Sequence, residues 1–373
     1  MELKRVVITG IGSVTALGLN AKETWKNIKA GVSGAGPITN FDASLFKTQF
    51  ACEAHGFKAE DYFDRKEARK MDRYAQFAIV AAREAIADCG IDLETADKDE
   101  IGVILGVGIG GLTTFSQEIQ EYAGTKTTLG PRFTPFFIPK VITDMACGLI
   151  SIEFGFRGPN YTTTSACASS SNALIDSFNL IRTGQVNMMV TGGAEAAIVD
   201  GGVGGVNSMH ALSTRNDDPA TASRPFSASR DGFVIGEGSG VLILEELEHA
   251  KARGAKIYAE LAGFGTSNDA YHITSPLKDG SGAAMAVKDA LEDAGLKPED
   301  IQYYNAHGTS THANDVGETA MLKLAFGEHA YKLHISSTKS ETGHMIGAAG
   351  TIEALLCVKA IEDNFVPPTI NLD

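Results

Sequence analysis

Two similar stretches of the chain decide the fold: AIADCG (85–90) leading into IGVILG (101–106), and ALEDAG (290–295) leading into IQYYNAHG (301–308). Each predicts the end of a helix, a glycine stop, a short polar turn and a strand. Because unrelated βα units share this pattern, the similarity alone leaves coincidence open. We favour two copies of one βαβ-rich unit, with a helix from each packed at the centre.

Apolar runs that end in glycine support an α/β architecture. Examples are VITGIG (7–12), GVILGVGIGG (102–111) and MMVTGGAE (188–195), which alternate with helical patterns and predict buried strands. At 373 residues the chain exceeds the size of one hydrophobic core. We therefore expect two halves, residues 1–255 and 256–373.

The two copies differ in length. The first continues through MMVTGG (188–193) and DGFVIGEGSGVLILE (231–245), which predict a glycine-kinked strand pair. The second stops at VPPTINLD (366–373), so we expect its sheet to have an unpaired edge. The second copy is predicted to be incomplete, and a chain ending at Asp373 to be poorly stable and inactive.

Composition excludes several classes of function. The net charge of −14 makes nucleic acid an improbable partner. The sequence has neither an apolar run of membrane-spanning length nor the N-terminal pattern of a signal peptide. We expect no membrane association and a cytoplasmic location. The odd number and irregular spacing of the cysteines argue against disulfides and a zinc site: Cys52, Cys89, Cys147, Cys167 and Cys357.

One cysteine lies in a context typical of a nucleophile. In YTTTSACASSSNAL (161–174) a β-branched run ends in small residues around Cys167, and a helix follows. A strand-to-helix turn would hold the sulfur at a helix N-terminus, where the dipole lowers a thiol pKa. A packed structural cysteine is the alternative.

Two histidines and a lysine favour catalysis. His307 follows an apolar strand in NAHGTST (305–311), and Lys339 and His344 share the polar stretch SSTKSETGHMIGAAG (336–350). Such groups in glycine- and threonine-rich loops are typical of catalytic sites. Their spacing does not match that of a metal site.

These three segments resemble the active-site signatures of the β-ketoacyl-acyl-carrier-protein synthases. LSTRNDDPATASRPF (212–226) and RDGFVIGEG (230–238) are most similar to the type II synthases of bacterial fatty acid synthesis, and the resemblance spans the whole chain. It implies the thiolase fold, a duplicated α/β/α/β/α arrangement, in a homodimer. It also implies decarboxylative condensation of an acyl thioester with malonyl-acyl-carrier-protein and no organic cofactor or metal.

The resemblance assigns the central roles. Cys167 would hold the acyl chain, and His307 and His344 would hydrogen-bond the malonyl thioester carbonyl and stabilise the enolate. Lys339 would orient the loop, with Glu318 as its ion partner.

The resemblance also names residues around the substrate. Thr309 and Thr311 would bind the pantetheine arm, Ile109 would gate the acyl pocket, and Val206 would lie beside that pocket. Val206 stands where Phe is frequent among the type II enzymes, which would widen the acyl pocket.

A basic run marks the expected carrier-protein surface. Lys66, Arg69, Lys70 and Arg73 recur at helical spacing and predict one basic face. In the family the corresponding face docks the acidic carrier, although a solvated surface helix would show the same pattern.

Two further departures from the family pattern leave chain-length preference open. His312 stands where Pro is usual after the catalytic His, and His210 where Arg is common. A polyketide ketosynthase would share every catalytic residue. Thiolases would have a second Cys where His344 stands. A non-catalytic partner subunit would lack Cys167, and a carrier-binding scaffold stays an alternative.

Overall fold

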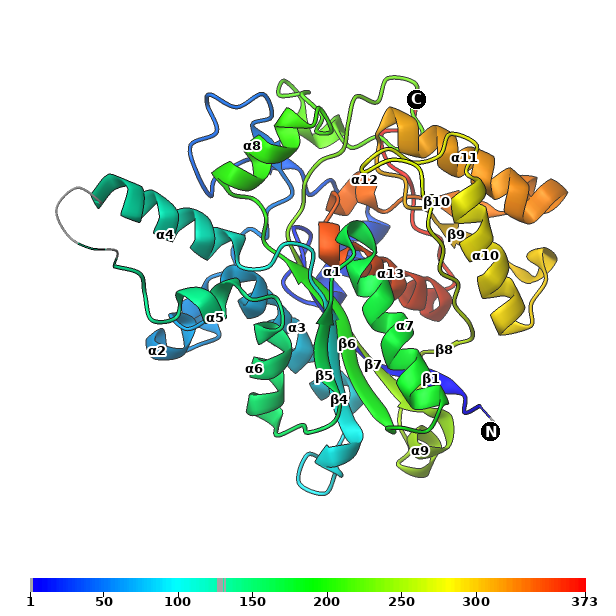
Figure 1. The fold of residues 1–373 in the computed structure, drawn as a ribbon. Helices are drawn as coiled ribbons and strands as arrows, with labels where there is room; N and C mark the ends of the chain where they lie inside the picture. The colour runs from blue at the N-terminus through cyan, green and yellow to red at the C-terminus, as the bar shows by residue number, and fades with distance from the viewer. Residues whose placement is uncertain (1–2, 126–129, 131) are drawn as a thin grey trace.

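The computed structural model describes residues 3–125, 130 and 132–373 (Figure 1). Its strands are β1 (Val6–Val14), β2 (Gly36–Pro37), β3 (Phe50–Ala51), β4 (Ile101–Gly106), β5 (Asn160–Thr163), β6 (Met188–Glu195), β7 (Gly238–Glu246), β8 (Ala259–Leu261), β9 (Tyr303–Asn305) and β10 (His334–Ser336). Its α-helices are α1 (Ala21–Lys29), α2 (Arg65–Ala68), α3 (Arg73–Cys89), α4 (Leu112–Thr125), α5 (Phe137–Val141), α6 (Met145–Phe154), α7 (Ser169–Arg182), α8 (Asp200–Ser208), α9 (Leu247–Ala252), α10 (Ser281–Ala294), α11 (His312–Phe326), α12 (Lys339–Thr342) and α13 (Ala349–Asp363). Four 3-10 turns matter below: η2 (Lys98–Glu100), η3 (Ala166–Ala168), η5 (Pro298–Asp300) and η7 (Ile346–Ala348).

The main sheet has the strand order β5-β4-β6-β7-β1-β8. β4 runs parallel to β5 and β6, whereas β6, β7, β1 and β8 pair in antiparallel fashion. α3 and α6 cover one face, and α7 and α13 cover the other (Figure 1). Because both faces are covered, β1, β4 and β6 are buried along their whole length, as the apolar runs predicted.

Two pairs of glycines show the duplication at the level of packing. A Cβ on Gly12 would overlap a backbone carbonyl of α3, and one on Gly265 would overlap a backbone carbonyl of α10. Gly10 and Gly263, two residues earlier, touch the same two helices. In each copy a Gly-x-Gly segment therefore lets a helix approach the backbone closely.

The remaining elements repeat in the same order. α3 and α10 both end at a left-handed glycine, a 3-10 turn follows (η2 or η5), and then a strand, β4 or β9. β4 pairs in parallel with β5, and β9 pairs in parallel with β10. β5 leads to η3 and the long helix α7, and β10 leads through the short helix α12 to η7 and the long helix α13. The predicted duplication is confirmed.

The copies stack into five layers. α3 and α6 form the first layer, the main sheet the second, and the central helices α7 and α13 the third (Figure 1). Tyr303 on β9 packs toward the α13 side, and Tyr304 packs against the cluster of α10 and α11. The β9–β10 sheet is thus the fourth layer and α10 with α11 the fifth, in the predicted α/β/α/β/α order.

The first copy has strands without counterparts in the described part of the second. β6 and β7 form the predicted strand pair, whereas the second sheet comprises β9 and β10 among the described residues. Residues 231–237 lie outside that pair. Ile235 forms a bridge with His344, and the Gly236 N–H donates to the His344 carbonyl at 2.9 Å. The segment before β7 therefore supports the loop of the second copy that carries His344.

Candidate active site

Cys167 lies on a strained turn between β5 and α7. Ala166 has φ 50°, a left-handed conformation that costs a residue with a Cβ about 1–2 kcal/mol. Cys167 follows in the middle of η3, directly before α7, and is half-buried. The predicted strand-to-helix turn is confirmed, and it holds the sulfur at the start of a helix.

His344 contacts the sulfur directly. Its Nε2 lies 2.9 Å from Sγ of Cys167, and its Nδ1 accepts the backbone N–H of Ile346 at 3.3 Å. In a neutral ring an accepting Nδ1 leaves the proton on Nε2. His344 therefore points an N–H donor at the sulfur, where it favours thiolate over thiol.

His307 completes the cluster from the end of β9. Its ring lies edge-to-face with His344, with ring centroids 5.4 Å apart. The Glu318 carboxylate accepts the backbone N–H groups of His307 and Gly308, both at 2.7 Å. Glu318 thus supports the loop that presents His307, from its place on α11.

The predicted ion pair of Lys339 with Glu318 is wrong. Lys339 is 1% exposed, and its ammonium pairs with Glu353 of α13. Glu318 is occupied by the backbone N–H groups of the His307 loop, whereas Glu353 faces α12 from the second turn of α13. Removing either partner of a buried pair leaves an uncompensated charge, so Lys339 and Glu353 lock α12 onto α13.

Burial and Lys339 set the charge of the cluster. Burial, aided by the nearby Lys339 ammonium, lowers the pKa of His307 to about 3. Burial, Lys339 and His307 lower the pKa of His344 well below its usual value. Both rings are therefore neutral hydrogen-bond donors near pH 7. Burial raises the pKa of the Cys167 thiol, although Lys339 opposes this. The helix N-terminus was expected to lower the pKa of Cys167, but the net shift of this pKa is upward.

The same three side chains have donor atoms suited to a metal. One atom each of Cys167, His307 and His344 lies within 4.8 Å of the others. The wide spacing of these residues in the sequence did not indicate that they lie so close together. However, the Lys339 ammonium acts on all three groups. A fixed positive charge beside the cluster opposes a second cation, and the set fits a thiol nucleophile with two N–H donors better.

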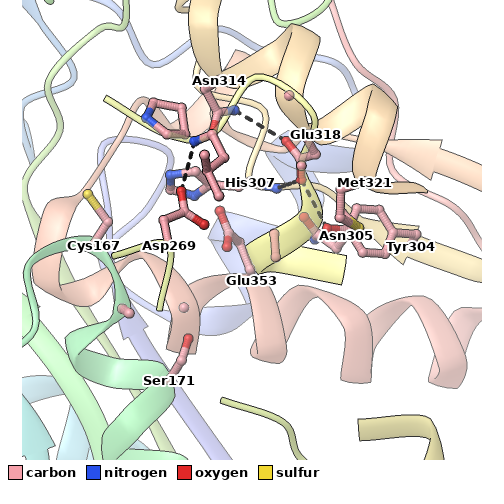
Figure 2. Close-up of a pocket in the computed structure, with 17 residues that line it drawn as sticks. Cys167, Ser171, Asp269, Tyr304, Asn305, His307, Asn314, Glu318, Met321 and Glu353 are labelled. Atoms are coloured by element: carbon pink, nitrogen blue, oxygen red, sulfur yellow. Dashed lines mark hydrogen bonds between the residues drawn. The ribbon is translucent and has the colours of Figure 1, made fainter. Parts of the chain in front are cut away.

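A cavity of about 440 Å³ opens beside the cysteine (Figure 2). Cys167 and His307 line it together with Asp269, Glu318 and Glu353. Figure 2 shows Cys167 at the left, Asp269 and Glu353 toward the middle and Glu318 further to the right, with side chains from both copies of the repeat. The Cys167 sulfur is therefore beside a space large enough for a thioester arm.

The remaining predicted substrate residues are spread around this centre. Thr309 and Thr311 hydrogen-bond each other at 2.9 Å, just after His307. Ile109 follows β4 and is 44% exposed, and Val206 lies half-buried on α8 in an apolar cluster that also contains Ile346. None of these three segments lines the cavity of Figure 2, and their substrate roles stay predictions.

The prediction that the four basic residues form one face of a single helix is wrong. α2 ends before Arg69 and α3 begins at Arg73, because the residue that caps α3 has an extended backbone. Lys66, Arg69 and Lys70 are exposed. Arg73 instead forms an ion pair with buried Glu237 at 2.8 Å. Three cations remain for a docking surface.

Sequence reasoning missed a carboxylate at the centre of the site. Glu195 ends β6, is fully buried, and accepts N–H groups from Gly108 and Ile109 of the first copy and Gly347 of the second. The only signal was a charged residue at the end of an otherwise small and apolar run, MMVTGGAE. Phe233, whose ring meets His344 edge-to-face at 5.3 Å, was missed as well.

A duplicated five-layer fold with a cysteine on a strained turn and two neutral histidines defines a thiolase-fold condensing enzyme. The chain belongs to the beta-ketoacyl synthase family. The model of the family's N-terminal domain matches residues 3–250, and that of its C-terminal domain matches residues 258–373.

Curated relatives share about half of the residues. The chain is 51% identical to 3-oxoacyl-acyl-carrier-protein synthase 2 of Synechocystis sp., covering 100% of this chain and 89% of that protein. It is 48% identical to the protein of the same name from Staphylococcus aureus, covering 99% and 88%.

Solved structures show the same fold. A type II polyketide ketosynthase in complex with its acyl carrier protein and bound to a hexaketide matches with a TM-score of 0.92 and 34% identity, over 100% of this chain and 89% of that one. A beta-ketoacyl synthase from Burkholderia phymatum matches with a TM-score of 0.89 and 36% identity, over 99% and 89%.

Among the described residues, no helix is long and apolar enough to cross a membrane.

Proposed function

We propose that the chain catalyses decarboxylative Claisen condensation between an acyl group held on Cys167 and malonyl-acyl-carrier-protein, giving 3-oxoacyl-acyl-carrier-protein. The observation that carries the proposal is the convergence of Cys167, His307 and His344 within 4.8 Å from the two copies of the repeat. A nucleophile next to two neutral N–H donors suits attack on a thioester followed by stabilisation of an enolate.

The first half of the reaction loads the enzyme. The Cys167 sulfur attacks the carbonyl carbon of the acyl thioester, the carrier's thiolate leaves, and it takes up the proton released by the Cys167 thiol. The N–H of His344 stabilises the sulfur anion during attack. Because the pKa of Cys167 is raised in the resting site, this donor supplies part of the activation that a helix N-terminus alone does not.

The second half forms the carbon–carbon bond. A malonyl thioester binds with its thioester oxygen at the two histidine N–H groups. Its C–CO₂ bond breaks, CO₂ leaves, and the electron pair becomes the enolate that both donors stabilise. The enolate carbon attacks the acyl-Cys167 carbonyl, and the Cys167 thiolate leaves. Lys339 stays paired with Glu353 and positions the histidine loop rather than donating a proton.

The relatives favour fatty acid elongation over polyketide synthesis. Identity is 51% and 48% to proteins named 3-oxoacyl-acyl-carrier-protein synthase 2, against 34% to the polyketide ketosynthase. A chain-length factor or scaffold role is disfavoured because Cys167 and both histidines are present and in contact.

The carrier protein is the proposed macromolecular partner. Lys66, Arg69 and Lys70 are exposed and lie close together in sequence around α2, so they offer cations to an acidic partner on a chain of net charge −14. Complementary charge would steer an acidic carrier to these cations. Arg73 contributes to holding α3 rather than to docking, since Glu237 neutralises it.

We also infer a homodimer. β5 is the outer strand of the main sheet; its Tyr161 is 40% exposed, and Ile152 on neighbouring α6 is 79% exposed. A second copy pairing along this edge would satisfy the free backbone groups and cover the apolar side chains. Sedimentation equilibrium should give twice the chain mass of 39.3 kDa.

The five unpaired cysteines support the reducing cytoplasm as the location.

Intact mass spectrometry tests the reaction. Incubation with a long-chain acyl carrier protein should add one acyl group to the chain, and Cys167→Ala should abolish this gain. Cys89→Ala is the matched control, because Cys89 is a buried thiol on α3 and should leave acylation unchanged. Adding malonyl-acyl-carrier-protein should then remove the acyl group and yield the 3-oxoacyl product. A folded wild-type chain that never gains mass would contradict the proposal.

A further inference from the structure

Glu195 joins two loops that meet at the active site. Its Oε2 accepts the N–H of Gly108 at 3.0 Å and that of Gly347 at 3.1 Å, while its Oε1 accepts the N–H of Ile109 at 3.2 Å. The backbones are so close that a Cβ on Gly347 would overlap the nitrogen of Gly108. Each of these N–H groups is directed at one fully buried carboxylate.

We propose that Glu195 is a positioning residue that sets the place of the Ile109 loop relative to the Ile346–Gly347 turn, and thereby controls which acyl chains reach Cys167. This inference rests on the proposed function and on the acyl-gating role predicted for Ile109, because it assigns Glu195 to the acyl specificity of that site.

One arm of the connection leads to His344. Ile346 has φ 46°, which is strained for a β-branched residue, so the turn needs external support. Glu195 provides it at the next residue, through the Gly347 N–H. The Ile346 N–H in turn donates to Nδ1 of His344, which leaves the His344 proton on Nε2, toward Cys167.

The other arm leads to Ile109. The carboxylate holds the backbone of Gly108 and Ile109, and the Ile109 side chain is 44% exposed, so its backbone anchor is what fixes it. A Cβ on Gly108 would lie 3.0 Å from the Ile346 side chain. The loop of the first copy and the turn of the second therefore move together only while the carboxylate accepts from both.

The charge state of Glu195 makes the link between the two loops depend on pH, and this dependence can be measured. Burial raises the pKa of Glu195 to about 7, against the opposing effect of the backbone N–H groups that it accepts. The titratable groups that face it are the Cys167 thiol of η3 and the Tyr74 phenol of α3, and both are neutral at pH 7 because burial raises their pKa values. Protonation of the carboxyl converts one acceptor oxygen into a donor and frees one loop.

The test measures access to Cys167 without requiring turnover. Peptide mass spectrometry gives the rates at which iodoacetamide and N-dodecyl iodoacetamide alkylate Cys167. In Glu195→Gln the amide oxygen can keep Gly108 and Gly347, but the amide nitrogen cannot accept from Ile109. The ratio of the alkylation rate with N-dodecyl iodoacetamide to the rate with iodoacetamide should therefore rise about fivefold, as expected for one lost hydrogen bond. In wild type the same rise should appear as pH falls through about 7, and it should be absent in Glu195→Gln.

Glu53→Gln is the matched control. Glu53 is 1% exposed and accepts the Thr39 and Asn40 N–H groups, which belong neither to the Ile109 loop nor to the turn at residues 346–347, so its loss should leave the ratio unchanged. Equal ratios in wild type and Glu195→Gln would overturn the proposal. If Glu195→Gln does not fold, a wild-type ratio that is flat between pH 6 and 8.5 would overturn it instead. Absence of acyl transfer in a wild type that is alkylated normally would contradict only the proposed function.

Discussion

The two copies of the repeat place the same strained turn at the active site and use it differently. Ala166 and Ile346 have nearly equal φ values, 50° and 46°, and each begins a 3-10 turn that runs into a long helix. The middle position of the turn is Cys167 in the first copy and Gly347 in the second. One turn presents the thiol of the proposed nucleophile, and the other presents a backbone N–H to Glu195. The turn of the first copy thus carries the proposed nucleophile, whereas the turn of the second copy positions its neighbours.

The approaches to the turns differ as well. β5, which leads to Cys167, is an exposed edge strand, whereas Ser336–Met345, which leads to the second turn, is buried along its length. Access to the thiol requires an open approach. The histidine side is rigid, because its polar side chains are enclosed and mostly hydrogen-bonded within the chain. Four substitutions test this contrast.

The largest effect is expected from Glu341→Met in the buried approach. Glu341 is 0% exposed, neither carboxyl oxygen has a hydrogen-bond partner among the described residues, and burial raises its pKa to about 9. The folded state therefore keeps a proton that the unfolded chain releases above about pH 4.5, so stability falls as pH rises from there toward 9. Methionine should raise the free energy of unfolding by roughly 2–4 kcal/mol at pH 8 and by little at pH 4.5.

Urea unfolding at the two pH values measures this difference. Glu328→Met is the control, because Glu328 is exposed and its replacement should change stability by less than about 0.5 kcal/mol. An equal gain at both pH values would show that the effect of Glu341 does not come from its proton.

Gly347→Ala should break the second turn. The added Cβ would overlap the Gly108 nitrogen and lie 2.8 Å from Oε2 of Glu195, and backbone atoms cannot move aside cheaply. We expect a loss of about 1–3 kcal/mol in unfolding free energy. Gly205→Ala on α8, where nothing lies within 4 Å of the new Cβ, should be neutral or slightly stabilising. Thermal and urea unfolding would compare the two variants, and equal behaviour would contradict the tight fit.

The smallest effects should have opposite signs. Ala166 is exposed, so Ala166→Gly relieves its left-handed strain without losing packing and should stabilise by about 0.5 kcal/mol. Ile346 packs in an apolar cluster, so Ile346→Gly should destabilise by about 1 kcal/mol despite the same relief. Urea midpoints distinguish these outcomes, and a common sign for both would contradict the balance of strain and packing assigned to the two turns.

Much of the fold and the central cluster could be predicted, for reasons visible in particular residues. Helix ends at Gly90 and Gly295 and small residues around Cys167 are local features, so the repeat and the strand-to-helix turn that carries Cys167 were recognisable in the sequence. Which carboxylate meets Lys339 depends on how α12 faces α13, and that is tertiary information. The spacing of the basic run failed because the extended cap residue before Arg73 interrupts the helix. Glu195 was hidden because its partners are backbone groups, which carry no sequence signature.

The close contacts of Gly12 with α3 and of Gly265 with α10 have an evolutionary consequence. After a gene duplicates, side chains that touch other side chains can change together, and the copies drift apart. A position where main chain rests on main chain has no compensating partner that could change. We therefore expect the Gly-x-Gly segments to change least as the two halves diverge, and an ancestral half rebuilt from this chain should begin from them.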